Sequence, residues 1–150
     1  MKYFAYGSNM DPERMRERSI SFSQRTHAIL KGYRLEFNKV ALHNPQEGYA
    51  NAVKFQNGIV EGVIYEIPGS DLSKLDTCEG YPNHYDRVKV NVKLDDGQEV
   101  EAGAYIAQPN KVRDCLKPSR DHLDHLLAAK DVLSEAYRRK LEALQPLDER

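Results

Sequence analysis

A glutamate at the end of a short predicted helix is the residue whose setting points most clearly to chemistry. Residues 71–79 have helical periodicity, and Gly80 follows them, which is typical of a helix end. At about 3.6 residues per turn, Leu72, Leu75 and Glu79 share one face, so the Glu79 carboxyl lies on the stripe that packs inward. Burial and the negative helix end both raise the pKa of a carboxyl, which suits a group that accepts a proton and returns it. Glu79 is therefore a candidate general acid and base.

The same position also has a purely structural interpretation. A frayed helix end would let the Glu79 side chain bend into solvent or pair with Arg87. Asp76, one turn earlier, is more easily solvated and is the weaker candidate for acid–base work. The helical pattern alone leaves both interpretations of Glu79 open.

The loop formed by Tyr6, Gly7, Ser8 and Asn9 is a second candidate. It follows a strand-favouring aromatic run at 3–6 and precedes Asp11-Pro12, a pair suited to begin a helix. A glycine loop that leads into a helix directs several backbone N–H groups to one place, so it can hold an anion or an oxyanion. It has too few glycines for a P-loop or a dinucleotide site. A tight turn without a ligand remains the alternative.

Extended runs dominate the middle of the chain. We expect strands over 26–30, 33–40, 51–55 and 60–65, with a two-residue hairpin turn at Asn57-Gly58. Strict alternation over 87–94 and 100–106, joined by a turn at 95–97, predicts a second hairpin. Tyr105 falls on the polar face of this hairpin, where it can point at a ligand or remain a half-buried surface side chain.

Serines mark the expected helix starts. Ser70 and Ser134 are each expected to cap the helical pattern that follows, and Ser119 is expected to begin a helical stretch. Many short strands with tight turns and a few helices indicate an α+β domain whose sheet curls into a small mixed β-barrel with flanking helices. At 150 residues, we expect a single domain over 1–150.

Composition excludes several classes of function. The chain has 22 basic and 23 acidic side chains, so we expect no nucleic-acid partner. Without an apolar run of about 18–20 residues or a signal peptide, we expect no membrane association and a cytoplasmic location. His122 and His125 could share a metal, but no third ligand is evident, so no metal site is predicted. Cys78 and Cys115 imply neither a disulfide framework nor a zinc site.

Three motifs together resemble the γ-glutamylcyclotransferase family. These are residues 3–9 (YFAYGSN), residues 75–80 (LDTCEG) followed by Tyr85, and Ala104-Tyr105. Their order and spacing match over nearly the whole chain, and residues 118–121 and 137–141 of the late helices extend the similarity. The resemblance implies a domain built on a small β-barrel, in agreement with the pattern of strands.

The resemblance also implies an activity. Enzymes of this family release 5-oxoproline and a free amine from a γ-glutamyl amino acid or γ-glutamyl amine by internal cyclisation, a lyase-type acyl transfer without a cofactor. Glu79 falls on the catalytic glutamate, residues 6–9 (Tyr6, Gly7, Ser8, Asn9) on the substrate loop, and Tyr105 on a tyrosine of the pocket, while Tyr85 is assigned to substrate binding on the same basis. Asn9 replaces the Leu or Ile that is typical of the glutathione-specific branch, which argues against glutathione.

A homodimer is expected by analogy with this family alone. The competing hypothesis is a non-catalytic module on the same fold that binds a small carboxylate or a partner, because related folds do not always retain an activity. A buried Glu79 carboxylate argues against this module, since it would repel an anionic ligand.

Overall fold

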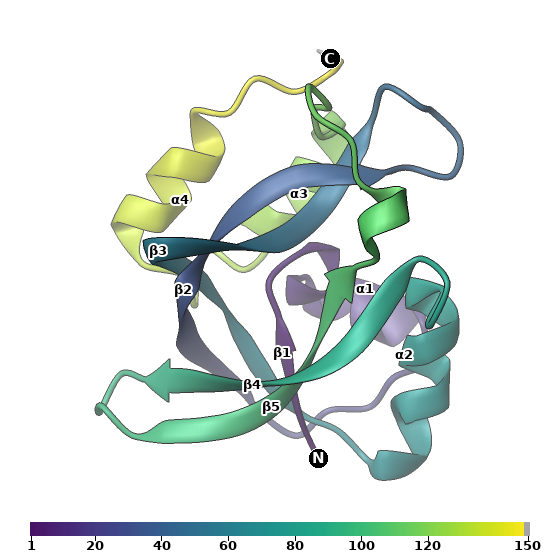
Figure 1. Ribbon diagram of the computed structural model, residues 1–150. Coiled ribbons are helices and arrows are strands. Elements are labelled where there is room, and N and C mark those ends of the chain that lie inside the picture. The colour runs from purple at the N-terminus through teal and green to yellow at the C-terminus, as the bar shows by residue number, and fades with distance from the viewer. Residues whose placement is uncertain (149–150) are drawn as a thin grey trace.

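Five strands close into a barrel in the order β1-β3-β2-β4-β5 in the computed structural model, which describes residues 1–148 (Figure 1). The strands are β1 (Lys2–Ala5), β2 (Arg25–Val40), β3 (Gly48–Glu66), β4 (Tyr85–Leu94) and β5 (Glu99–Ala107). The helices are α1 (Pro12–Glu17), α2 (Leu72–Glu79), α3 (Arg120–Leu127) and α4 (Glu135–Glu142). The predicted α+β class and the small mixed barrel with flanking helices are confirmed.

The barrel combines antiparallel hairpins with one parallel contact. β4 and β5 pair as the alternation predicted, with Val92 opposite Val100 and Arg87 opposite Tyr105. β1 is antiparallel to β3 and closes the barrel through a parallel pair, Tyr3 with Gly103. The sheet is therefore mixed because β1 lies between the two hairpins.

The predicted turn at Asn57-Gly58 is wrong. β2 and β3 are each continuous, and the connection between them is the segment 41–47. Asn57 has a φ of 67°, and a Cβ atom on Gly58 would lie 2.4 Å from the Tyr33 carbonyl oxygen. The register of the two strands shifts close by, between Lys31 and Tyr33. An Asn-Gly pair supplies the left-handed backbone of a bulge as readily as that of a hairpin turn, so the dipeptide alone misled the prediction.

Most of the predicted helix caps are confirmed. The side chains of Asp11 and Ser134 each accept a backbone N–H from the first turn of the helix that follows. Ser119, where a helical stretch was expected to begin, caps α3 in the same way. Gly80 ends α2 in the left-handed conformation, with a φ of 66°. The cap at Ser70 is wrong, because that residue lies inside a 3-10 turn that leads into α2, and no side chain caps either the turn or the helix.

Two hydrophobic clusters lie on opposite faces of the barrel wall. One includes Phe4, Val60 and Val92. The other includes Tyr3, Leu75, Leu126 and Leu141 and packs the helices against the barrel. Adjacent residues of β1 alternate between the two clusters, because successive side chains of a strand point to opposite faces. Side chains on both faces of β1 are therefore buried.

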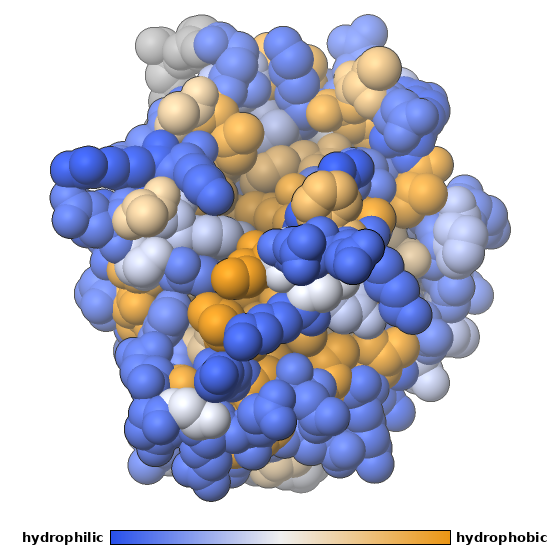
Figure 2. Space-filling view, turned by 60° about the vertical axis from the view of Figure 1, so that its left-hand side comes forward, coloured by the Kyte–Doolittle hydropathy of each residue, from blue (hydrophilic) through white to orange (hydrophobic). Residues whose placement is uncertain are grey.

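Some large apolar side chains reach the surface, and Figure 2 shows orange patches between hydrophilic residues on one face. Leu42, Phe55 and Ile59, all from the β2–β3 hairpin or its connection, are exposed. Within residues 1–148, every helix is too short or too polar to cross a membrane.

Candidate functional site

A cavity of about 340 Å³ opens beside the barrel, between the end of β1, α1, the end of α2 and the β2–β3 hairpin. This volume is within the range of about 300–1,000 Å³ that is usual for small-molecule sites. Its wall contains every residue singled out from the sequence as a site residue: Tyr6, Gly7, Ser8, Asn9, Glu79, Tyr85 and Tyr105. The fold thus brings together side chains from three separate parts of the sequence.

Glu79 is the last residue of α2, and its half-buried side chain forms part of the cavity wall. Burial raises the pKa of this carboxyl, while the positive charges of Arg18, Arg14 and Lys39 act in the opposite direction. Its carboxylate does not pair with Arg87, because the Arg87 guanidinium pairs with Asp76 instead. The pairing of Glu79 with Arg87 is therefore wrong, and Glu79 has the environment of a proton-transfer group.

Asn9 holds Glu79 in place. Its side chain is 2% exposed, and its Nδ2 donates to Glu79 Oε1 at 3.1 Å and to the Tyr3 hydroxyl at 3.0 Å. Its Oδ1 accepts from Arg18 Nη1 at 2.7 Å. Because a guanidinium can only donate, this contact fixes the orientation of the amide and aims its N–H groups at Glu79.

Gly7 and Ser8 form the loop between β1 and the first helical turn. A Cβ atom on Gly7 would lie 3.2 Å from the Cβ of Ala50, so a side chain there would press against β3. Ser8 begins a 3-10 turn that continues into α1. The first N–H groups of such a turn have no partner within it, so they are available to a ligand in the cavity.

The three tyrosines have their hydroxyl groups engaged by the protein. The Tyr6 hydroxyl donates to the backbone carbonyl of Tyr105, and the Tyr85 hydroxyl donates to the carbonyl of Ala50 at 2.8 Å. The Tyr105 hydroxyl donates to Asp76 Oδ1 at 2.7 Å. Burial raises the pKa of all three phenols. They therefore remain protonated and act as a rigid wall.

Tyr105 does not lie on a polar surface, which corrects the sequence-based expectation. It points away from Ala104, as the alternation predicted, but that face is covered by the second hydrophobic cluster, and Tyr105 is only 4% exposed. Tyr85 belongs to the same cluster and also lines the cavity. Both side chains serve core and cavity together, because the helices cover the outer face of the barrel there.

Three cations of the cavity wall were missed in the sequence: Arg14, Arg18 and Lys39. Arg14 and Arg18 are four residues apart, so the helix after Asp11 could have placed them on one face. Lys39 lies near the end of β2, and its Nζ is 5.6 and 5.7 Å from the ring centroids of Tyr49 and Tyr85. Nothing in its local pattern distinguishes Lys39 from a surface lysine.

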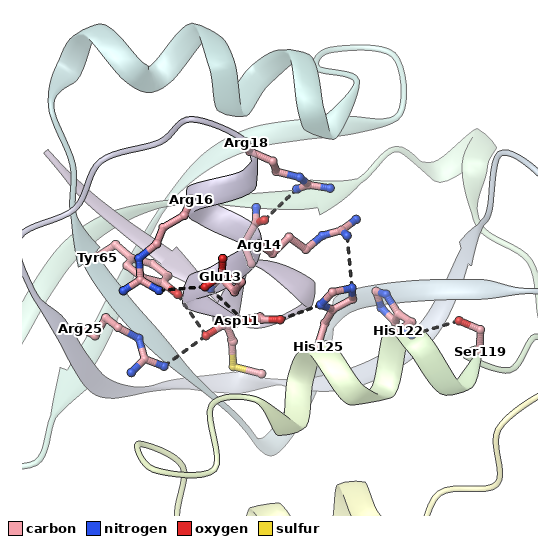
Figure 3. A network of polar contacts seen from close by, with 12 residues as sticks. Asp11, Glu13, Arg14, Arg16, Arg18, Arg25, Tyr65, Ser119, His122 and His125 are labelled. Atoms are coloured by element: carbon pink, nitrogen blue, oxygen red, sulfur yellow. Dashed lines mark hydrogen bonds and ion pairs between the residues drawn. The ribbon is translucent and has the colours of Figure 1, made fainter. Parts of the chain in front are cut away.

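His125 orients Arg14 (Figure 3). Its Nδ1 is 2.8 Å from Asp11 Oδ2, and its Nε2 is 3.3 Å from Arg14 Nη1. Because Arg14 can only donate, Nε2 of His125 accepts and Nδ1 carries the proton shared with Asp11. The helix cap of α1 is therefore connected through His125 to a guanidinium in the cavity wall.

His122 is also engaged by the protein. Its Nε2 accepts the backbone N–H of Ala50 at 3.0 Å, and burial lowers its pKa to about 3. It is therefore neutral and serves as an acceptor for β3. The described part of the chain contains no cluster of three or more His, Cys, Asp or Glu residues with the geometry of a metal site.

Comparisons with known proteins extend over this whole site. Residues 3–138 match the model of the family described as gamma-glutamyl cyclotransferase, AIG2-like. The Homo sapiens gamma-glutamylcyclotransferase is 29% identical over 150 residues, which cover 97% of this chain and 79% of the human one. A solved structure named gamma-glutamyl cyclotransferase has a TM-score of 0.87 and 27% identity, covering 99% of this chain and 90% of that one. YkqA from Bacillus subtilis has a TM-score of 0.81 at 27% identity and covers 97% of this chain and 55% of its own.

Proposed function

Because the chain belongs to the gamma-glutamyl cyclotransferase, AIG2-like, family, we propose that it releases 5-oxoproline and a free amine from a γ-glutamyl amino acid or a γ-glutamyl amine. Membership of this family supports a cyclotransferase activity for the chain. The observation that carries the finer proposal is the Glu79 carboxyl, whose pKa is raised by burial in the wall of a small-molecule cavity. Such a carboxyl can accept a proton near neutral pH and give it back.

The proposed reaction is an internal acyl transfer. The α-amine of the substrate attacks its own γ-carbonyl carbon, so a new C–N bond closes the five-membered ring and the bond to the leaving amine breaks. Glu79 takes the proton from the attacking nitrogen and delivers it to the leaving nitrogen. Atoms and charge balance with this one carboxyl, and the proposal therefore includes no cofactor.

The protein contributes mainly position and electrostatics. Because nucleophile and electrophile belong to one molecule, the cavity has to hold that molecule in the folded conformation in which they meet. The rigid wall of Tyr6, Tyr85 and Tyr105 serves this purpose. The N–H groups of Gly7 and Ser8 would receive either the oxyanion of the tetrahedral intermediate or a carboxylate of the substrate.

A non-catalytic carboxylate-binding module is the second candidate, and the cations Arg14, Arg18 and Lys39 favour it. They attract anions whether or not a reaction follows. Glu79 argues against it, because a carboxylate in the same wall weakens the binding of an anion and is useful only for proton transfer. The two functions therefore differ in what the loss of Glu79 would do.

The test is 5-oxoproline production from γ-glutamyl-alanine, ε-(γ-glutamyl)-lysine and glutathione, measured with the parent protein and with Glu79→Gln. We expect product with the parent and none with the variant, while the fold is retained. Glu142→Gln is a matched control, because Glu142 is exposed and also ends a helix, α4. A Glu79→Gln variant as active as the parent would contradict the proposed role. Ligand binding in calorimetry without product from the parent would favour the binding module.

A further inference from the structure

The charges in the cavity wall are unequal. Among the residues that line it, three side chains are cationic, Arg14, Arg18 and Lys39, whereas Glu79 is the only carboxylate. A γ-glutamyl group carries one carboxylate and one amine of its own. Its carboxylate needs one cationic partner, so the wall has positive charge left for another anionic group.

These cations differ from other half-buried ones in the protein. Arg25 pairs with Asp131 and Arg87 with Asp76, whereas within residues 1–148 no carboxylate lies within ion-pair distance of Arg14, Arg18 or Lys39. Burying a charge without an opposite charge is costly. A carboxylate supplied by a ligand would remove that cost.

Lys39 is the most buried of the three cations, and it has unused hydrogen-bonding capacity. It is 2% exposed, and its Nζ donates to the backbone carbonyl of Val40 at 2.8 Å. An ammonium has three N–H donors, so two remain without a hydrogen-bonding partner in the described part of the chain. Burial lowers the pKa of Lys39, as expected for an ammonium without a counter-ion.

The cations approach Glu79 from different elements. Arg14 lies in α1, and Arg18 directly follows the end of that helix. Arg18 is joined to Glu79 through the side chain of Asn9. Lys39 comes from β2, directly before the connection 41–47. That connection contributes Leu42, which is 66% exposed, to the cavity wall.

We propose that Lys39 binds a carboxylate on the leaving amine, so that the protein selects γ-glutamyl amino acids over γ-glutamyl amines that lack this carboxylate. The proposal rests on the proposed function and assigns the glutamyl carboxylate to Arg14 and Arg18. In a γ-glutamyl amino acid, one carbon separates the leaving nitrogen from its α-carboxylate. The receptor for this carboxylate must therefore lie in the same cavity as Glu79, as Lys39 does.

The test compares two substrates that differ in this carboxylate alone, γ-glutamyl-alanine and γ-glutamyl-ethylamine. A charge-assisted hydrogen bond of about 1.5–3 kcal/mol corresponds to roughly a 10- to 150-fold preference in kcat/KM for the alanine compound. Lys39→Gln should remove this preference, because kcat/KM for γ-glutamyl-alanine falls, mainly through a higher KM, by more than kcat/KM for γ-glutamyl-ethylamine. Lys39→Arg should restore part of it.

Lys31→Gln is the matched control, because Lys31 is an exposed lysine of the same strand. It should keep the preference of the parent. The ratio of kcat/KM for the two substrates is measured with the parent protein alone. The proposal can therefore be refuted even if a Lys39 variant fails to fold.

Two results would overturn the role of Lys39 alone. One is equal kcat/KM for both substrates in the parent, and the other is an equal loss on both substrates in Lys39→Gln. If the parent forms no 5-oxoproline from any γ-glutamyl compound, the proposed function itself fails, and the role of Lys39 fails with it. The failure of each proposal therefore has its own signature.

Discussion

Replacing Asn9 with leucine should move the acidic limb of the pH–rate profile to higher pH. The Asn9 amide donates to Glu79 Oε1 at 3.1 Å. Donation to a carboxylate favours its ionised form and therefore lowers its pKa. Leucine has a similar size but no donor, so the pKa of Glu79 rises in the variant, and more of it is protonated at a given pH.

The size of the shift follows from the strength of this one hydrogen bond. A hydrogen bond to a charged group contributes about 1.5–3 kcal/mol. Glu79 is half-buried, so the lower end of that range applies. At about 1.36 kcal/mol per pKa unit, the loss of this bond shifts the pKa of Glu79 up by roughly one unit. The change also leaves Arg18 and the Tyr3 hydroxyl without a partner, so the fold loses about 1–3 kcal/mol of stability.

The assay is kcat/KM for 5-oxoproline release between about pH 5 and pH 9, because this ratio reports the ionisation of the free enzyme. The base must be ionised to accept a proton, so kcat/KM falls below its pKa, and the fall should begin about one pH unit higher in Asn9→Leu. Asn91→Leu, at an exposed asparagine of β4, is the control and should keep the parent profile. A lower kcat/KM with an unshifted limb would refute the reasoning, because Asn9 would then contribute to binding alone.

Three further predictions concern stability and are measured by thermal melting. Burial raises the pKa of Glu79 above its unfolded value, so Glu79→Gln should melt higher than the parent at pH 8, with the difference vanishing below about pH 4.3; a constant difference would contradict this. Burial opposes the charging of His27, but hydrogen bonds to Asp95 and Glu61 outweigh burial and raise the pKa of His27. His27→Gln should therefore cost most stability below about pH 6.5 and progressively less as pH rises through the folded pKa; an effect that grows with pH would be inconsistent. A Cβ atom on Gly48 would lie 1.9 Å from a backbone carbonyl oxygen, whereas one on Gly69 would meet nothing within 4 Å. Gly48→Ala should thus destabilise by about 1–3 kcal/mol and Gly69→Ala by less than about 0.5 kcal/mol, and equal effects would count against this account.

Features that depend on neighbouring residues could be predicted from the sequence. The caps at Asp11 and Ser134 and the β4–β5 hairpin follow from turn and cap chemistry over a few positions. The Asn57-Gly58 turn failed because the same dipeptide serves a bulge, and the choice depends on how β2 and β3 pair along their whole length. Strand pairing over long separations is not encoded in any short pattern.

The candidate site shows the same limit. Glu79 could be found because its own helix places it on an apolar face. Lys39 could not, because it lines the cavity only after the β2–β3 hairpin has packed beside the barrel. The role of His122 could not be found from its spacing to His125, because its contact with Ala50 joins segments 72 residues apart. Partners at such distances decide whether a polar residue serves the site or the fold.

The register shift between Lys31 and Tyr33 divides the β2–β3 hairpin into two parts. Nearer the barrel, the hairpin pairs with β1 and β4. Beyond it, residues 33–40 and 48–54 pair with each other and bridge to the segment before α3, and this outer arm brings Lys39 to the cavity. Under the proposed role of Lys39, substitutions in the arm should change which amines are accepted without touching the strand pairs that close the barrel.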